Sequence, residues 1–392
     1  MRLSVFAAAL FLSLPSVALA SVPCGGSFDS FISNMKTEAV SRGHSRANVD
    51  RFFSNARHDP AVIRADNAQG VFKKTFIDFS RAVISQNRMT NGRRNAERYD
   101  TVFDRVEREY GVSRGVLLAF WALETDYGAV QGDFNTLNSL LTLSHDCRRP
   151  DLFRPQVFAA LELYERGDFD PVSTKGAWAG EIGMVQMLPK DILENGVDGD
   201  GDGRVSLKTS PADALLSGAR MLRGLGWRAN EPWLQEITVP SNLDWSETGL
   251  NHERSVREWA RRGVAARSGR LGAGNLNASV LLPMGRNGPA FLAYPNFSVY
   301  FEWNKSFVYV TTAAYFATRL EGAPVYDART PSPALSDAQM RNLQSKLAAR
   351  GRDVGAIDGI LGAKTRAAVQ AEQVRLGLPA DAWPTTDLLN RL

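Results

Sequence analysis

The sequence predicts a mainly α-helical (α+β) protein with a small β element and a separate, smaller helical domain at its C-terminus. Across residues 21–320, apolar residues recur at spacings of three and four with charged residues between them, the pattern of amphipathic helices. Within residues 233–309 this pattern loosens into short β-branched and aromatic runs separated by Gly and Pro. A Gly- and Pro-containing stretch then precedes a compact, helix-patterned final segment.

The first twenty residues are expected to form a cleavable export signal. Arg2 supplies the positive start, residues 5–14 are apolar, and Ala18-Leu19-Ala20 is a small-x-small cleavage site. The apolar run is shorter than the roughly 20 residues that cross a bilayer, and no other stretch qualifies, so we expect no integral membrane segment. A lipid anchor on Cys24 is the alternative, disfavoured because Pro23 precedes it.

The net charge argues against a nucleic-acid partner, and the two cysteines predict a disulfide. The formal charge of +4 is mild, and no basic run carries interleaved aromatic residues, so no nucleic-acid partner is expected. The two cysteines, Cys24 and Cys147, are expected to form a disulfide in an oxidising compartment. A catalytic thiol with His145 as its partner is the less favoured alternative.

Several helices can be placed individually. Residues 49–53, 71–83 and 99–110 show helical spacing of apolar residues. Ser113 is a candidate N-cap for a further helix that ends before Gly128, and its apolar face is formed by Val116, Leu117, Phe120 and Leu123. Residues 297–301 are expected to belong to the β element.

The chain divides into three parts after the export signal. Residues 21–320 form the main domain, and residues 321–334 form a linker marked by Gly and Pro. Residues 335–392 form the small domain, with three expected helices at residues 335–347, 365–376 and 386–392. This unit is too small to bury much core and is expected to be an accessory module.

Glu124 is the candidate catalytic residue. It follows four apolar or aromatic residues near the end of a helix, with Trp121 three residues before it and Tyr127 three after it. Apolar surroundings disfavour the charged carboxylate and raise its pKa, which suits a general acid for glycosidic bonds. The alternative is a helix-end Glu that is solvated or paired with Lys or Arg.

Three segments, in the right order, resemble motifs of the lytic murein transglycosylases of the B type. Residues 122–128, ALETDYG, resemble that family's E-T-x-Y-G signature, and residues 176–189, GAWAGEIGMVQMLP, are similar to its G-S-x-A-G-A-x-G-x-x-Q-F-x-P stretch. Residues 291–297, FLAYPNF, with residues 303–309, WNKSFVY, resemble its late Y-x-N-F…Y-N-x-S-x-x-Y segment.

The resemblance implies a lysozyme-like catalytic domain in the periplasm that acts on the glycan strands of peptidoglycan. Glu124 would be the sole catalytic carboxyl and would cleave the MurNAc-GlcNAc β-1,4 bond with formation of a 1,6-anhydro end. Gln186 would line the sugar site, and Tyr294 and Asn296 would orient the N-acetyl sugar. The motifs also assign substrate contacts to Tyr127, Asn304 and Tyr309.

Four positions depart from the family pattern. Ala177 replaces a Ser that usually touches the catalytic carboxyl, and Glu181 replaces a small residue. Met187 stands for the usual Phe and Trp303 for a Tyr. The first two departures keep two alternatives open: a non-catalytic peptidoglycan-binding scaffold, and a muramidase that uses water with Glu181 as a second acid.

An acidic loop at residues 198–209 predicts a structural Ca²⁺ site. Asp198, Asp200 and Asp202 occupy positions 1, 3 and 5 of an EF-hand-like loop, and the backbone carbonyl of Arg204 falls at position 7. Thr209 stands where a bidentate Glu usually closes the shell. The resemblance assigns the closing role to Asp213, and the alternative is a solvated acidic turn.

The C-terminal segment 357–370, IDGILGAKTRAAVQ, is similar to the D-G-x-x-G-x-x-T-x-x-A-V signature of the peptidoglycan-binding domain type one. The resemblance implies that residues 335–392 bind the cell wall. Glu372 departs from it, because the family prefers Phe there. A generic three-helix appendage is the alternative.

Overall fold

The computed structural model describes residues 24–68, 74–272 and 274–392. The export signal expected over residues 1–20 therefore lies outside the described residues, as do residues 71–73 of one predicted helix. Within the described ranges, no helix is both long and apolar enough to cross a membrane.

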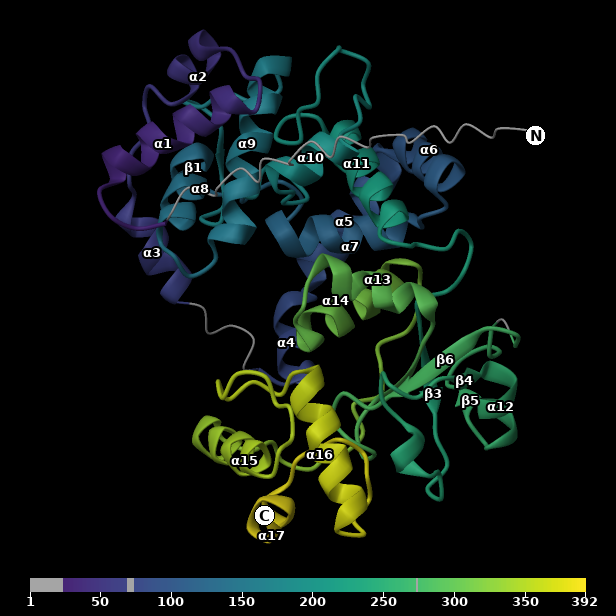
Figure 1. The fold of residues 1–392 in the computed structure, drawn as a ribbon. Helices are drawn as coiled ribbons and strands as arrows, with labels where there is room; N and C mark the ends of the chain where they lie inside the picture. Colours follow the sequence, from purple (N-terminus) through teal and green to yellow (C-terminus); the bar gives the residue numbers. More distant parts are fainter. Residues whose placement is uncertain (1–23, 69–73, 273) are drawn as a thin grey trace, which may run out of the picture.

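Helices dominate the architecture, as Figure 1 shows. Those before the main sheet are α1 (Phe28–Ser41), α2 (Arg46–Phe52), α3 (Pro60–Asn67), α4 (Phe76–Val83), α5 (Gln86–Arg98), α6 (Asp100–Tyr110), α7 (Arg114–Thr125), α8 (Thr136–His145), α9 (Pro150–Arg166), α10 (Pro189–Asn195) and α11 (Pro211–Gly224). Those that follow are α12 (Val256–Arg261), α13 (Pro295–Trp303), α14 (Phe307–Leu320), α15 (Asp337–Ala349), α16 (Ala363–Arg375) and α17 (Thr386–Arg391).

Most predicted helices are present close to their expected positions. Ser113 is the N-cap of α7, and its hydroxyl accepts a hydrogen bond from the Gly115 backbone N–H at 3.3 Å. Helix α7 is buried over most of its length, so it forms the centre of the main domain rather than a surface helix.

The β element is an antiparallel five-stranded sheet in the order β4-β6-β7-β3-β5. Its strands are β3 (Leu234–Thr238), β4 (Arg254–Ser255), β5 (Ala265–Ala266), β6 (Asn277–Leu281) and β7 (Ala290–Ala293). A second, two-stranded sheet pairs β1 (Phe134–Asn135) with β2 (Lys175–Gly176) and fixes the start of the loop that carries Gln186.

The prediction of β structure at residues 297–301 was wrong, because these residues lie in α13. Pro295 occupies the first helical position, which its fixed φ favours. Phe297 and Tyr300 then fall on one buried face, where Tyr300 stacks on Phe120 of α7 at a centroid distance of 5.1 Å. Tertiary packing has therefore overridden the β propensity of these aromatic residues.

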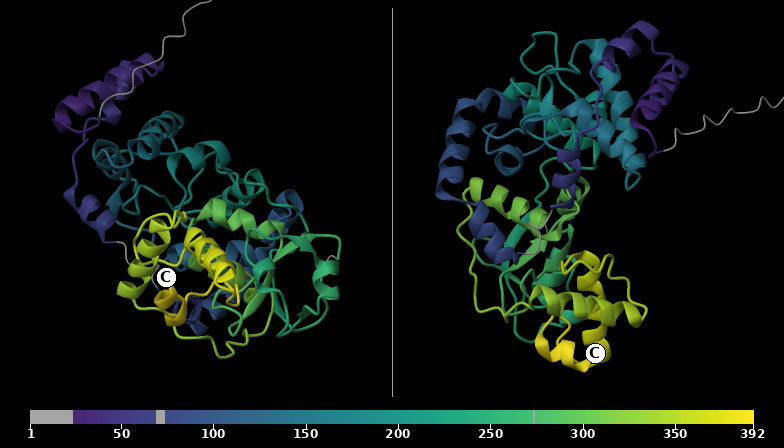
Figure 2. Two further views of the ribbon diagram at one scale, coloured as in Figure 1. Left: turned by 60° about the horizontal axis from the view of Figure 1, so that its bottom comes forward. Right: turned by 90° about the vertical axis from the view of Figure 1, so that its left-hand side faces the viewer.

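Two lobes meet at α13 and α14 (Figures 1 and 2). One lobe consists of the N-terminal helices up to α11, apart from α4, and the other holds the five-stranded sheet and the C-terminal helices α15–α17. A large hydrophobic cluster includes residues of α7, α13 and α14. Helix α7 precedes the strands of the five-stranded sheet in the chain and α13 and α14 follow them, so segments before and after the sheet share one core.

A disulfide joins Cys24 to Cys147, with a Cα–Cα distance of 5.1 Å and a sequence separation of 123. The Gly25 N–H also donates to the His145 carbonyl at 2.8 Å, at the end of α8. The start of the described chain is thus held against the main domain by one covalent and one polar contact.

The C-terminal helices form their own core and also dock on the main domain. Arg366 of α16 is buried, donates to the Pro283 carbonyl at 2.7 Å and lies 4.3 Å from the ring centroid of Phe307. Gln370 donates to the carbonyls of Trp245 and Thr248 at 3.0 and 2.8 Å. These contacts fix α16 against the region that follows β3 and against α14.

Glu372, the departure from the wall-binding motif, is buried but fully paired. Its carboxylate accepts from Arg352 at 2.8 Å and from Arg375 at 2.7 Å. Two guanidinium groups therefore compensate the charge of this buried carboxylate.

Candidate active site

The end of α7 places Glu124 where two other segments meet it. The helix stops because Asp126 and Tyr127 take left-handed conformations, with φ of 52° and 60°. The Thr125 hydroxyl donates to the Met184 carbonyl at 2.6 Å. This bond ties the last turn of α7 to the loop that carries Gln186.

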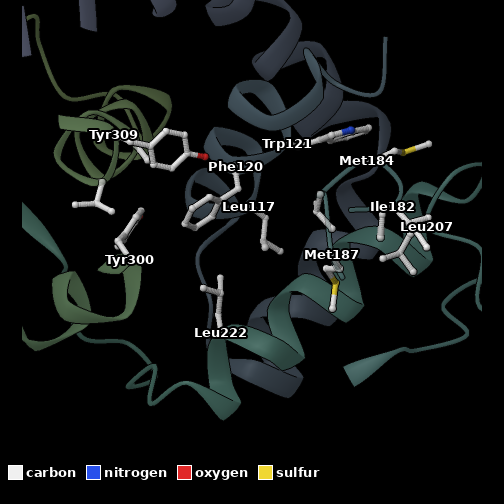
Figure 3. Packing of buried hydrophobic residues seen from close by; sticks show 14 of the residues in the cluster. Leu117, Phe120, Trp121, Ile182, Met184, Met187, Leu207, Leu222, Tyr300 and Tyr309 are labelled. Carbon is white, nitrogen blue, oxygen red and sulfur yellow. The ribbon is translucent and has the colours of Figure 1, made fainter. Parts of the chain in front are cut away.

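Two donors from a distant segment contact the Glu124 carboxyl. The Tyr309 hydroxyl donates to Oε1, and the Trp303 indole N–H donates to the same oxygen at 3.2 Å. Trp303 is held in place by stacking on Phe120, at 4.3 Å between ring centroids and 26° between planes. Figure 3 shows the Tyr309 hydroxyl directed towards α7 beside Phe120.

These surroundings perturb the acidity of the site. Burial raises the pKa of Glu124, and the hydrogen bonds from Tyr309 and Trp303 lower it again only in part. Burial and the Glu124 charge hold the pKa of Tyr309 well above its ordinary value, so this residue remains a donor. The arrangement suits a carboxyl that delivers a proton and then accepts one.

The loop after β2 carries two polar side chains of the motif. Its backbone folds back through an antiparallel bridge between Ile182 and Met187. Gln186 lies in this turn with a φ of 53°, and its side-chain amide donates to the Gly183 carbonyl at 2.7 Å. Burial, followed by the charge of Glu124, raises the pKa of Glu181 to about 7.

Tyr127 and Asn304, both predicted substrate contacts, help to shape the segments around Glu124. The Tyr127 hydroxyl donates to the Arg88 carbonyl at 2.8 Å, and its ring packs edge-on against Trp121. The Asn304 side-chain oxygen accepts from the Ser306 N–H at 2.9 Å, at the turn into α14. That turn leads from Trp303 to Tyr309 and so sets the positions of both donors.

Tyr294 and Asn296 make their side-chain hydrogen bonds with residues other than Glu124 in the part of the chain that the structure describes. Tyr294 belongs to a second core cluster, within the sheet region, and its hydroxyl donates to Gln235 at 2.8 Å. Asn296 is fully buried, and its side chain exchanges hydrogen bonds with the backbone N–H and carbonyl of Arg228 at 2.7 and 2.8 Å. Both polar groups are used by the fold, and their expected role in orienting the N-acetyl sugar stays a prediction.

The sequence pattern alone predicted no role for Trp303 at the Glu124 carboxyl. The sequence feature that could have indicated this role is the Trp at position 303, directly before Asn304, where the motif has Tyr. A Tyr and a Trp both carry one donor at the tip of a ring, so Trp can contact the same carboxyl. Trp303 thus supplies a hydrogen bond to Glu124 from the position where the motif has Tyr.

The acidic loop gathers three carboxylates as the sequence predicted. One oxygen each from Asp198, Asp200 and Asp202 lie within 4.8 Å of one another. The Asp198 carboxylate also accepts from the Gly201 and Gly203 N–H groups at 2.7 and 2.9 Å, which fixes the curve of the loop. Clustered carboxylate oxygens are the ligands that Ca²⁺ prefers.

Asp213 lies outside this group of three and acts on the backbone. Its Oδ1 accepts from the Gly199 N–H at 2.8 Å and its Oδ2 from the Ser206 N–H at 2.7 Å. Both ends of the loop are thus held by one buried carboxylate. Asp213 therefore supports the backbone of the loop, and its expected role as the closing ligand stays a prediction.

Known proteins match both domains. The profile of a family described as "Transglycosylase SLT domain" matches residues 27–318, and that of a "Putative peptidoglycan binding domain" matches residues 336–392. The chain is 24% identical over 276 residues to membrane-bound lytic murein transglycosylase B of Escherichia coli, covering 67% of this chain and 75% of the relative.

Solved structures extend the likeness over nearly the whole chain. SltB3 from Pseudomonas aeruginosa, in complex with NAG-anhNAM-pentapeptide, superposes with a TM-score of 0.85 at 35% identity, covering 94% of this chain and 99% of SltB3. Escherichia coli Slt35 in complex with calcium shares the fold, with a TM-score of 0.65 at 23% identity, covering 79% of this chain and 98% of Slt35. The chain therefore belongs to the transglycosylase SLT domain family and is a peptidoglycan lytic transglycosylase with a C-terminal peptidoglycan-binding domain.

Proposed function

We propose that Glu124 performs both proton transfers of the lytic transglycosylase reaction. In the first step, the protonated carboxyl gives its proton to the glycosidic oxygen between MurNAc and GlcNAc. The bond from that oxygen to C1 of MurNAc breaks, and the muramoyl N-acetyl group stabilises the cationic centre. In the second step, the Glu124 carboxylate takes the proton of the C6 hydroxyl, whose oxygen bonds to C1 and closes the 1,6-anhydro ring.

The hydrogen bonds at Glu124 support this double role. Tyr309 and Trp303 both contact Oε1, which leaves Oε2 to exchange the proton with substrate. The raised pKa favours the acid form before the first step, and the two donors stabilise the carboxylate between the steps. Gln186, Tyr127 and Asn304 line the neighbouring segments and remain proposed substrate contacts.

A digest of purified sacculi tests the assignment. Wild-type protein should release fragments with 1,6-anhydro ends, seen by mass spectrometry. Glu124→Gln should release none, while Glu302→Gln, an exposed carboxylate on α13, should act like wild type. Release of anhydro fragments by Glu124→Gln would remove Glu124 from the mechanism, and reducing ends from wild type would point to hydrolysis.

We also propose that the loop of Asp198, Asp200 and Asp202 holds a structural Ca²⁺ ion. The three convergent carboxylates support this, as does the calcium complex of Slt35, which has the same fold. The carbonyl of Arg204 would add a ligand, and Asp213 would support the loop from behind. The ion would offset the repulsion between the carboxylates and take no part in proton transfer.

We propose a periplasmic location for the mature chain. The signal-like pattern of residues 1–20 and the disulfide support export to an oxidising compartment next to the cell wall. The substrate class agrees, because peptidoglycan lies outside the inner membrane. Detection of the protein in a periplasmic fraction, with a mature start at Ser21, tests this proposal.

A further inference from the structure

A cavity of about 230 Å³ lies between α4, the start of α5, α14 and the segment that follows α14. The polar side chains that line it are those of Ser80, Arg81, Gln86, Tyr315, Arg319 and Tyr326. Within the described chain, two of the lining residues are arginines and none is an aspartate or a glutamate. The side chains around this cavity therefore carry a net positive charge, which favours an anion over a cation or a neutral group.

Arg319 is fixed in place and still has donors to offer. Its Nε donates to the Ala323 carbonyl at 2.8 Å, and its Nη1 donates to the Tyr315 hydroxyl at 3.2 Å. Its Nη2 contacts no acceptor, and no carboxylate pairs with it, among the residues that the structure describes. Because a guanidinium carries five N–H donors, most of those of Arg319 remain for a ligand.

The Tyr315 hydroxyl adds a buried donor beside Arg319. Tyr315 is 4% exposed, and its oxygen accepts from Arg319 and from the Tyr326 N–H at 3.1 Å. Both lone pairs are then used, so the hydroxyl can make a further hydrogen bond only by donating its own O–H. No acceptor for this O–H lies within the described ranges, and a buried polar group without a partner is costly. A ligand oxygen in the cavity would satisfy it.

Arg81 supplies the second positive charge. It is exposed and forms no hydrogen bond or ion pair with any described residue. Burial raises the pKa of Tyr326, while the Ser80 hydrogen bond and then the charge of Arg81 act against this shift, so the guanidinium lies near the Tyr326 hydroxyl. Asp78 also acts on Tyr326, but it is not part of the lining, and its carboxylate accepts from the Thr75 hydroxyl at 2.7 Å.

We propose that this cavity binds a single oxyanion, a peptide carboxylate or a phosphate, between Arg81 and Arg319, with the Tyr315 hydroxyl as a third donor. Guanidinium groups bind both kinds of anion through paired N–H donors. The stem peptides of peptidoglycan end in free carboxylates and are the first source to test. This choice of source rests on peptidoglycan as the substrate, and not on the role of Glu124.

The oxyanion site is separate from the catalytic acid. Arg319 lies ten residues after Tyr309 on α14, which corresponds to roughly 15 Å along the helix axis at about 1.5 Å per residue. Tyr326 belongs to the segment that leads to the C-terminal domain. A bound oxyanion would therefore connect α4 and α14 to this segment and take no part in proton transfer.

Calorimetric titration of the mature chain tests the site at pH 7 and constant ionic strength. The probes are N-acetyl-D-alanyl-D-alanine, its C-terminal amide and sodium phosphate. The free acid, phosphate or both should bind, and the amide should bind at least tenfold more weakly than the free acid, because it lacks the charge. Tighter binding of the free acid would identify a stem peptide as the source, and tighter binding of phosphate would identify a phosphate group. Absence of binding by both would overturn the proposal.

Variants locate the binding in this cavity. Arg81→Glu should weaken binding at least tenfold, because it places a like charge against the anion. Tyr315→Phe should weaken it about tenfold, through loss of a hydrogen bond to a charged group. Arg46→Glu, at an exposed position on α2, makes the same change in net charge and should bind like wild type.

Melting temperatures of the variants show whether each one is folded, and the exposed position of Arg81 makes its variant the safer of the two. Unchanged affinity in folded Arg81→Glu or Tyr315→Phe, or an equal loss in Arg46→Glu, would overturn the proposal. These titrations do not depend on Glu124, so a failure of the proposed mechanism would appear only in the sacculus digest.

Discussion

The Tyr309 hydroxyl controls how the proton is held on Glu124. Because it donates to the carboxylate, it favours the charged form that must exist between the two steps. The neighbouring Tyr300 provides a contrast: its hydroxyl is buried and has no hydrogen-bond partner in the described structure. Tyr309 and Tyr300 thus lie in the same core and differ in that only the Tyr309 hydroxyl forms a hydrogen bond, the one to Glu124.

Tyr309→Phe should lower kcat about tenfold to hundredfold, since a hydrogen bond to a charged group contributes roughly 1.5–3 kcal/mol. The pKa of Glu124 should rise further, so the alkaline limb of the kcat–pH profile should move to higher pH. Steady-state release of anhydro fragments from pH 5 to pH 9 measures both effects. Tyr300→Phe is the control and should leave the profile unchanged; an equal loss in both variants would indicate general damage to the core.

Burial of Glu124 should also make stability depend on pH. Its folded-state pKa is raised above the ordinary value, so the folded protein binds this proton more tightly than the unfolded chain does. The unfolding free energy therefore falls as pH rises from the ordinary carboxyl pKa through the raised one. Glu124→Gln should remove this decrease in unfolding free energy with rising pH, because glutamine does not ionise.

Thermal unfolding at pH 4 and pH 8 checks the sign. The melting temperatures of wild type and Glu124→Gln should agree within error at pH 4. At pH 8 the variant should have the higher melting temperature. The difference should be roughly 2–4 °C for each kcal/mol by which its unfolding free energy exceeds that of wild type. A lower melting temperature for the variant at pH 8 would mean that the ionised carboxylate is stabilised in the fold.

At the scale of elements, the acidic loop and α11 form one unit. Ser210 caps the start of α11 by accepting from the Asp213 N–H, and the Asp213 carboxylate also holds both ends of the loop. An ion bound by the three exposed or partly exposed carboxylates would therefore stabilise the helix as well as the loop.

Addition of 1 mM CaCl₂ should raise the melting temperature relative to EDTA, since a ligand at 100 times its Kd adds about 2.7 kcal/mol. Asp200→Asn should abolish the increase. Glu97→Gln, an exposed carboxylate on α5, should keep it. An identical melting temperature for wild type in Ca²⁺ and in EDTA would rule out a stabilising ion.

For the whole molecule, the small domain is docked instead of hanging from a free linker. Tyr326, within the linker predicted over residues 321–334, is buried against Phe76 and Tyr315. Burial lowers the pKa of Arg366 to about 9, which marks how closely the two domains enclose this side chain. The wall-binding domain therefore has a set orientation relative to Glu124.

Arg366→Ala should weaken docking by about 2–4 kcal/mol, because it removes a buried charged hydrogen bond and a cation–π contact. Calorimetry should then resolve two unfolding transitions, and small-angle scattering should give a larger radius of gyration. Lys364→Ala, on the same helix but with an exposed side chain, should resemble wild type. A compact Arg366→Ala protein with one transition would show that other contacts hold the domains.

Local sequence patterns predicted the helical class, the α7 helix with Glu124 near its end, the three clustered carboxylates and the three C-terminal helices. These features depend on local signals, namely apolar spacing, N-cap residues and ligand spacing within a short loop. The side chains that reach Glu124 could be identified only from the folded chain. Trp303 and Tyr309 lie 179 and 185 residues away in sequence, and Tyr294 and Asn296 turn into the fold. Side-chain direction and the pairing of distant segments follow from packing across the whole core, which no local pattern encodes.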